Sequence, residues 1–201
     1  MRDVQITVLV LDFLKEDESR ACLSSIRQNL KVPHKVVYLD NGGAQDYSWE
    51  MYKEGLCDVL ISKREGRGGG YGQTDLFRWC DTPYALFVQQ DQMLAEEIDE
   101  VRFARFTQML DRGYQCIDLN GDQSNRGVWT DRAHLMETQV FNQCGPFPNG
   151  GPGNDAPKWN ELHMQETFAA RGYKIAHISP AFFIDCGRTS VREAGDGLLV
   201  H

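Results

Sequence analysis

The sequence predicts one α/β domain in which helices flank a mostly parallel central sheet. Three observations favour this fold class: short apolar runs recur along the chain, amphipathic stretches separate them, and turn residues stand between the two. The chain has 201 residues, of which 41% are hydrophobic and 10% aromatic, enough for one sizeable core. We therefore expect a single domain over residues 1–201.

The first elements predict a βαβ unit. Ile6–Leu11 is a continuous run of β-branched residues and leucine, which is typical of a strand buried on both faces. Asp17–Leu30 has an acidic first turn and an apolar stripe at helical spacing, so it predicts a helix. The run KVVYLDN that follows Pro33 predicts the parallel partner strand.

The same alternation continues toward the carboxyl end. Gly113 and Gly172 supply stops for two of the helices. Residues 145–159 are too rich in glycine and proline for regular structure, so we expect a loop there, and loops of this length are usually functional or mobile. The sequence predicts further strands over residues 58–63, 84–88, 114–119 and 173–178, and helices over residues 46–56, 72–80, 95–111 and 160–172.

The charge balance and the cysteines exclude several classes. With 21 basic and 29 acidic residues the net charge is -8, so double-stranded nucleic acid is not an expected partner. Six cysteines at irregular spacing, with no C-x-x-C pair, argue against a zinc site and a disulfide framework. The apolar run near the N-terminus is far shorter than the ~20 residues of a spanning helix and lacks a signal-peptide layout. We expect a cytoplasmic protein without a transmembrane segment.

Polar residues follow the predicted strands at the edge where open α/β sheets bind ligands. Asp12, Asp40 and Asp91 follow three of the strands, and the glycine-rich run GRGGGYG follows another, beside Arg64. One aspartate at a strand end is often a turn or capping residue. Three together favour a ligand site, and the glycines allow backbone to approach that ligand closely. The run is neither a P-loop nor a dinucleotide fingerprint.

The order of these motifs resembles the family 2 glycosyltransferases. The resemblance covers about residues 4–190, on the motifs ITVLVLDFLKED, HKVVYLDNGGAQD, LISKREGRGGGYGQTDLF, YALFVQQDQML, GPFP and RGYKIAHISPAFF. It implies the GT-A fold, a Rossmann-like sandwich with a nucleotide-binding half over about residues 1–94 and an acceptor-binding half over about residues 95–201. It also implies inverting transfer of a hexosyl or rhamnosyl group from a UDP- or dTDP-linked donor to a hydroxyl of a carbohydrate or other acceptor.

The resemblance implies a nucleotide site along the strand ends. Asp12 and Phe13 fall where the family surrounds the nucleobase, and Asp40 falls where an acid accepts a hydrogen bond from the uracil imide. The glycine run and the helix start after it fall against the nucleotide and its sugar. The nucleotide-binding residues that it implies are Asp12, Phe13, Asp40, Asn41, Arg64, Gly69, Gly70, Asp75 and Gln90.

The resemblance also implies a divalent cation, Mn²⁺ or Mg²⁺. Asp91 falls on the last acid of the D-x-D element, whose metal neutralises the departing diphosphate and needs only one or two protein carboxylates. Gln89 stands at the first acid of that element and adds no charge. Asp185, in AFFIDCG, falls near the family's last metal ligand and is the second expected ligand, restoring the charge that is absent at Gln89.

An inverting transfer needs a base for the acceptor hydroxyl. The resemblance places it at Glu161, with Asp155 in the preceding loop and Glu166 as the alternatives, while Leu162 replaces the second acid of the family's Glu-Asp pair. The changes at Gln89 and Leu162 keep open a catalytically impaired nucleotide-sugar-binding module. A sugar-phosphate nucleotidyltransferase is a further alternative, but the G-x-G-x-R loop of that class is absent after the first strand.

Overall fold

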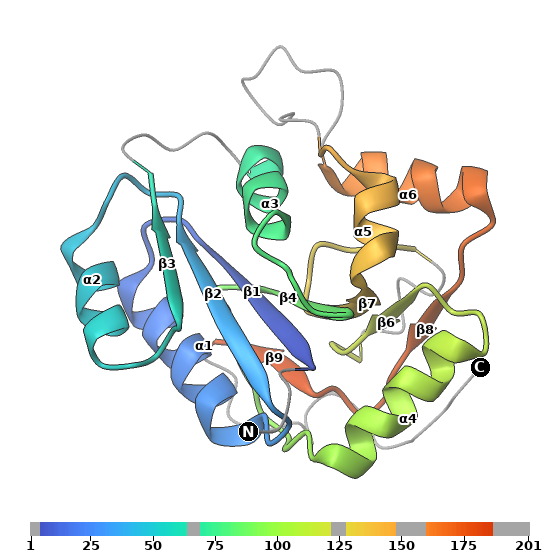
Figure 1. The fold of residues 1–201 in the computed structure, drawn as a ribbon, viewed down its shortest axis with the longest axis horizontal. Helices are drawn as coiled ribbons and strands as arrows, with labels where there is room; N and C mark the ends of the chain where they lie inside the picture. The colour runs from blue at the N-terminus through green and yellow to red at the C-terminus, as the bar shows by residue number, and fades with distance from the viewer. Residues whose placement is uncertain (1–4, 64–68, 122–127, 148–159, 187–201) are drawn as a thin grey trace.

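A computed structural model describes residues 5–63, 69–121, 128–147 and 160–186. Its centre is a seven-stranded sheet in the order β3-β2-β1-β4-β7-β6-β8 (Figure 1). Within it β7 runs antiparallel to β4 and β6, and the other neighbouring pairs are parallel. The strands are β1 (Ile6–Asp12), β2 (His34–Asp40), β3 (Val59–Ser62), β4 (Tyr84–Gln89), β6 (Cys116–Asp118), β7 (His134–Glu137) and β8 (Ile175–His177).

Helices cover both faces of this sheet (Figure 1). Val8 of β1 belongs to one core with Leu23, while its neighbour Leu9 belongs to the other core with Leu76. The β1 run is therefore buried on both faces, as its continuous apolar pattern predicts. One face carries α1 (Glu16–Asn29), α2 (Asp46–Lys53) and α4 (Glu100–Asp111), and the other carries α3 (Gly69–Phe77), α5 (Thr138–Cys144) and α6 (Asn160–Arg171).

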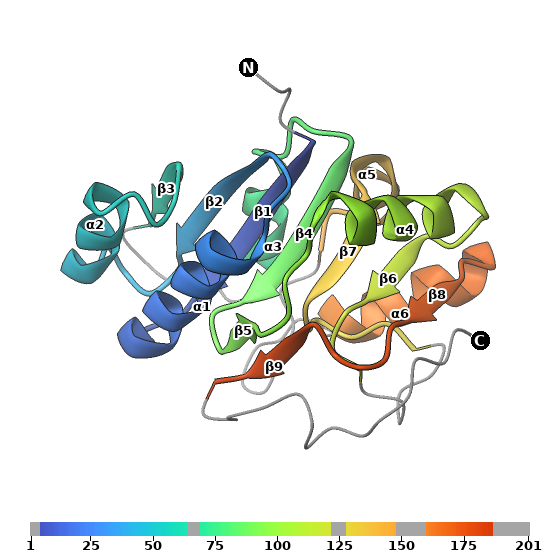
Figure 2. The same cartoon turned by 90° about the horizontal axis from the view of Figure 1, so that it is seen from below.

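The structure corrects the helix predicted over residues 95–111. The helix starts at Glu100, because the Asp99 side chain accepts a hydrogen bond from the Arg102 backbone N–H at 2.7 Å and caps it. Just ahead of it, β5 (Gln92–Leu94) pairs antiparallel with β9 (Phe183–Asp185) in a separate two-stranded sheet (Figure 2). The sequence prediction also lacks β7, α5 and both strands of this small sheet.

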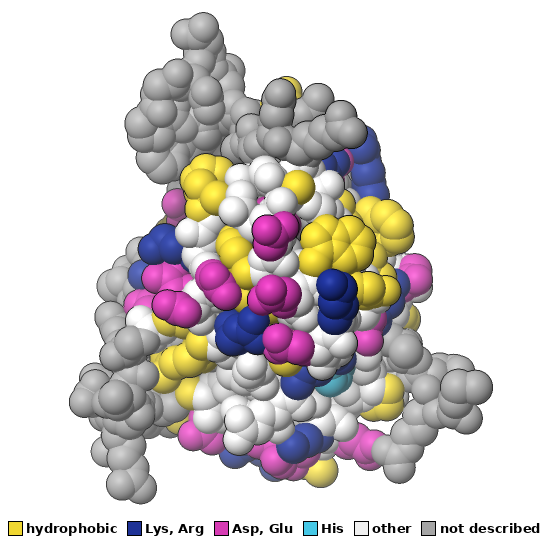
Figure 3. Space-filling view, turned by 90° about the vertical axis from the view of Figure 1, so that its left-hand side faces the viewer, with side chains coloured by type: hydrophobic (Ala, Val, Ile, Leu, Met, Phe, Trp, Pro, Cys, Tyr) yellow, Lys and Arg dark blue, Asp and Glu magenta, His cyan; other side chains and the backbone are white. Residues whose placement is uncertain are grey.

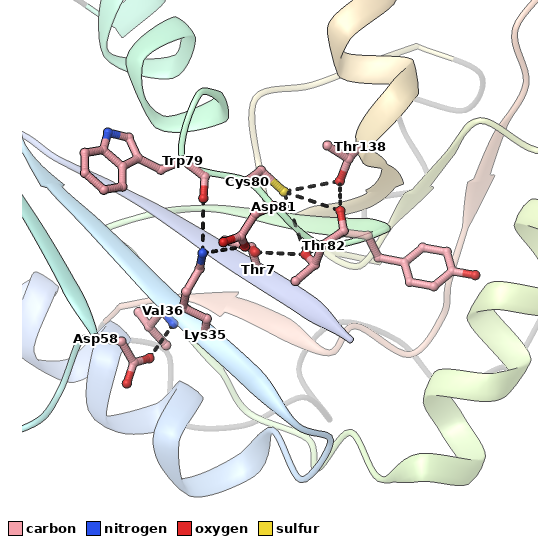
Figure 4. A network of polar contacts seen from close by, with 10 residues as sticks. Thr7, Lys35, Val36, Asp58, Trp79, Cys80, Asp81, Thr82 and Thr138 are labelled. Carbon is pink, nitrogen blue, oxygen red and sulfur yellow. Dashed lines mark hydrogen bonds and ion pairs between the residues drawn. The ribbon is translucent and has the colours of Figure 1, made fainter. Parts of the chain in front are cut away.

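Polar contacts connect residues at the amino ends of the strands of the large sheet (Figure 4). The Lys35 ammonium donates to the Trp79 carbonyl and pairs with the Asp81 carboxylate. The hydroxyls of Thr7 and Thr82 hydrogen-bond at 2.8 Å between β1 and the residues before β4. These contacts join the starts of β1 and β2 to the residues between α3 and β4.

Acidic and basic side chains are interspersed on the side of the molecule that carries α2 and β3 (Figure 3). This face offers no continuous basic surface, in agreement with the net charge of -8. Within the described ranges, no helix has both the length and the hydropathy that crossing a bilayer requires.

Candidate active site

Asp12 ends β1 at the carboxyl edge of the sheet and is fully buried. Its carboxylate accepts hydrogen bonds from the Ser19 hydroxyl of α1 at 2.7 Å and from the Tyr47 hydroxyl of α2 at 2.8 Å. Both oxygens thus bind groups of the chain itself. Asp12 therefore links α1 and α2 to the end of β1. Its contact with a nucleobase stays a prediction. The neighbouring Phe13 is 54% exposed, so an apolar ring is available to a ligand there.

Asp40 ends β2 directly beside Asp12 and is also fully buried. One oxygen accepts from the Gly42 N–H at 2.9 Å; the other accepts from the Gln45 N–H at 2.6 Å and the Ser48 hydroxyl at 3.0 Å. Asp40 therefore fixes the turn that leads into α2. Its hydrogen bond to a uracil imide stays a prediction. Asn41, which follows it, is likewise buried.

The glycine-rich run leads into α3, which begins at Gly69 and includes Gly70. A Cβ at Gly72 would lie 2.7 Å from a methyl carbon of Leu11, so the missing side chain lets α3 pack against the end of β1. This packing brings a helix N-terminus to the carboxyl edge, where it favours an anionic group. Arg64 lies outside the described residues.

Asp75 on α3 makes two ion pairs. Its carboxylate lies 2.8 Å from the Lys63 ammonium, just after β3, and 3.4 Å from the Arg78 guanidinium. The pair with Lys63 ties α3 to β3 across the glycine-rich run. The sequence did not single out Lys63, which adds a cation at this edge.

Asp91 lies in the turn between β4 and β5, next to the carboxyl edge. The Gln90 N–H donates to the Leu11 carbonyl of β1 at 3.1 Å, and the Cys186 N–H donates to the Asp91 carbonyl at 2.6 Å. β9 thereby carries Asp185 alongside the turn, opposite Gln92 (Figure 2). Burial raises the pKa of the Asp91 carboxyl, and the nearby Asp185 and Glu18 raise this pKa further.

This concentration of negative charge fits a divalent cation. Among the described residues, no group of three or more His, Cys, Asp or Glu side chains is arranged to hold a metal ion without other ligands. A cation at Asp91 would therefore depend on phosphate oxygens and water for most of its coordination, as Mg²⁺ and Mn²⁺ sites at nucleotides do.

Asp131 is a residue that the sequence prediction did not include. It lies just before β7, burial raises its pKa, and the Gln89 amide at the end of β4 is near enough to lower this pKa again. Asp131 is near enough to Asp91 to raise the pKa of that carboxyl too. No sequence signal could find it, because β7 is too short to be recognised and only the fold places its approach beside β4.

Glu161 lies in the first turn of α6 and is partly buried. Burial raises its pKa, Asp131 raises it further, and Arg132 lowers it. Asp131 is therefore near enough to both Asp91 and Glu161 to raise their pKa values. Leu162 is 43% exposed, and the alternative base Asp155 lies outside the described residues.

No protein-family profile and no curated protein sequence matches the chain. Solved structures do match. A mannosyltransferase from Pyrobaculum calidifontis, PcManGT, in complex with GDP-Man and Mn²⁺, superposes with a TM-score of 0.64 at 14% identity, over 85% of this chain and 53% of that one. TarS from S. aureus gives 0.63 at 14% identity, over 91% of this chain and 37% of TarS.

A third match is glucosyl-3-phosphoglycerate synthase from Mycobacterium tuberculosis, in complex with Mn²⁺, UDP and glucosyl-3-phosphoglycerate. It gives a TM-score of 0.63 at 13% identity, over 92% of this chain and 73% of that one. The chain thus spans about half of PcManGT and less than half of TarS. At such low identity the likeness concerns the fold. The chain has the GT-A fold of glycosyltransferases that the sequence resemblance implies.

Proposed function

We propose that this chain transfers a sugar from a UDP- or dTDP-linked donor to a hydroxyl acceptor, with inversion and with help from Mn²⁺ or Mg²⁺. One observation carries the proposal: β4 brings Asp91 to the carboxyl edge of a GT-A sheet, near Asp131, which in turn is near Glu161. A metal-binding carboxylate and a candidate base are the two groups that this reaction needs. The acceptor is a carbohydrate or another hydroxyl compound.

Each part of the site has a separate task in this proposal. The N-terminus of α3, at Gly69 and Gly70, faces the phosphates with backbone N–H groups. Asp91 would hold the cation, with Asp185 as the second carboxylate, and a cation bound there would supply positive charge to the departing diphosphate. Glu161 accepts the proton of the acceptor hydroxyl. Attack from the face opposite the leaving group then inverts the anomeric centre.

A catalytically impaired nucleotide-sugar-binding module is the second candidate. Gln89 lacks the charge of the expected first acid, and the exposed Leu162 lacks that of the second acid near Glu161. Both changes affect catalysis or metal affinity and leave a nucleotide pocket possible. This candidate predicts nucleotide binding without turnover, whereas the leading proposal predicts both.

Replacing Glu161 tests the assigned base. Glu161→Gln is expected to lower turnover by about 10²- to 10⁴-fold, the range typical of general-base catalysis. Nucleotide affinity should hardly change, because the side chain acts on the acceptor. Turnover would be followed as nucleotide release, and affinity by calorimetry. Full turnover in this variant would move the base elsewhere, and Asp155→Asn is then the next variant to measure.

A thermal-shift screen tests the proposed function as a whole. The melting temperature of the protein would be recorded with UDP, dTDP and GDP, each with Mn²⁺ and with EDTA. Binding to the folded state alone raises stability by ~2.7 kcal/mol when the ligand is at 100 times its dissociation constant. UDP or dTDP with Mn²⁺ should give the largest increase. GDP is included because PcManGT was solved with GDP-Man. The absence of any increase would contradict the proposal.

A further inference from the structure

Asp131 reaches the site because β7 runs antiparallel to β4. Phe87 pairs with His134 in this ladder, so residues after Phe87 and residues before His134 approach the same edge of the sheet. Gln89 and Asp131 are two and three residues further on. Their side chains approach each other there, close enough for the Gln89 amide to favour the ionised Asp131 carboxylate. The fold thus brings the end of β4, on the donor side of the proposed site, next to the segment before β7 that carries Asp131, on the acceptor side.

α6 brings Glu161 to the same place. The Gln165 side chain donates to the Trp129 carbonyl at 3.0 Å, which fastens α6 to the segment that carries Asp131. Glu161 precedes Gln165 by one helical turn and so lies on the same face of α6. The effect of Asp131 on the pKa of Glu161 agrees with this proximity. The two carboxyl groups, one just before β7 and one on α6, therefore lie near each other.

The side-chain type at position 89 suits this arrangement. A glutamine amide can donate a hydrogen bond to the Asp131 carboxylate, whereas an aspartate at position 89 could only accept and would repel it. The charge that the D-x-D element lacks on β4 is thus present across the β4–β7 ladder. Asp131 then supplies the acid that β4 lacks, and Gln89 positions its carboxylate.

We propose that Asp131 is a second catalytic carboxylate, which together with Glu161 receives the proton of the acceptor hydroxyl while Gln89 holds it in position. This inference rests on the proposed function. The acceptor O–H bond breaks and its proton passes to the carboxylate pair. The acceptor oxygen forms a bond to the anomeric carbon, and the bond from that carbon to the diphosphate oxygen breaks with its electron pair. Two adjacent carboxyl groups can share one proton and so act as one unit.

The test uses the full chain, with Mn²⁺ and the UDP- or dTDP-sugar that the native protein hydrolyses fastest, water serving as acceptor. Asp131→Asn should lower kcat about 100-fold or more and leave the Kd for UDP with Mn²⁺ within about twofold. Asp131→Asn combined with Glu161→Gln should be no slower than the slower single variant, because both residues act as a unit. Gln89→Leu should lower kcat without raising KM.

Glu137→Gln is the matched control, since Glu137 lies at the far end of β7 from Asp131 and should keep native kcat. Retained kcat in Asp131→Asn would overturn the inference. The inference would also be overturned if Asp131→Asn lost Mn²⁺-dependent UDP binding as Asp91→Asn is expected to do, since Asp131 would then be a ligand on the donor side. If Asp131→Asn fails to fold, native kcat in Gln89→Leu overturns it. A native protein that neither binds nor turns over these nucleotides would instead refute the proposed function.

Discussion

Asp91→Asn is expected to abolish Mn²⁺-dependent nucleotide binding and to raise the melting temperature of the free protein. Asp91 is the acid placed to ligate the cation, so the loss should exceed the roughly 10- to 100-fold decrease seen when a residue behind a metal ligand is changed. The stability gain follows from the raised pKa of Asp91 in the folded protein, which burial and the nearby Asp185 cause. The ionised carboxylate is less favourable there than in the unfolded chain.

The sign of this effect sets its pH dependence. Because the folded protein holds the Asp91 proton more tightly than the unfolded chain, the native protein loses stability as pH rises through the unfolded and then the folded pKa. The cost persists at higher pH and vanishes at pH values below both. The melting-temperature gain of Asp91→Asn should therefore be present near pH 7 and shrink on acidification.

Calorimetric titration of UDP with and without Mn²⁺, and melting curves from pH 3 to 8, would measure both effects. Asp111→Asn is a suitable control, because Asp111 is an exposed acid at the end of α4. Unchanged Mn²⁺-dependent UDP binding in Asp91→Asn would refute the metal role of Asp91. A lower melting temperature would refute the claim that this buried charge costs stability.

Asp40→Ala is expected to destabilise the free protein by about 2 to 4 kcal/mol, since each buried polar group left without a partner costs about 1–3 kcal/mol. The variant removes the acceptor for the Gly42 N–H, the Gln45 N–H and the Ser48 hydroxyl. For a domain of this size the melting temperature should fall by roughly 5 to 15 °C. Uridine donors should also bind more weakly, all by a similar ~1.5 to 3 kcal/mol if a charged hydrogen bond is lost.

Melting curves and donor affinities of Asp40→Ala and Asp40→Asn would separate these effects. The asparagine variant keeps one carbonyl acceptor, so its melting temperature should lie between those of the native protein and the alanine variant. A native melting temperature in Asp40→Ala would contradict the structural role of its hydrogen bonds. A loss confined to one donor sugar would mean that Asp40 recognises the sugar and not the base.

The sequence predicts β1, β2 and β4 well, because each of these strands is a long, continuous apolar run. Ile6–Asp12 is buried along its whole length, and Asp91 lies at the carboxyl edge where the strand-end rule places it. The strands β5, β7 and β9 were not predicted, because each is short and forms through an antiparallel partner that is distant in the sequence. Asp131 escaped prediction for the same reason. The equally short β6 and β8 lie within the longer strand-like runs YQCIDL and YKIAHI.

The sequence also could not show how the strand-end acids are used. It places Asp12 and Asp40 at the binding edge but cannot tell that Ser19, Tyr47 and Ser48 bond to their carboxylates. Those partners come from helices whose rotation is set by core packing. Likewise, the sequence shows only that Gln89 lacks the charge of the expected acid. The pairing of β4 with β7 is what brings Asp131 close to Gln89.

The release of nucleotide from UDP- and dTDP-sugars tests the central claim most directly. The native protein would be incubated with each donor in Mn²⁺, in Mg²⁺ and in EDTA, beside Asp91→Asn. We expect release from at least one donor, and this release should require the metal and disappear in the variant. Release that persists in EDTA or in Asp91→Asn, or no release from any donor, would contradict it.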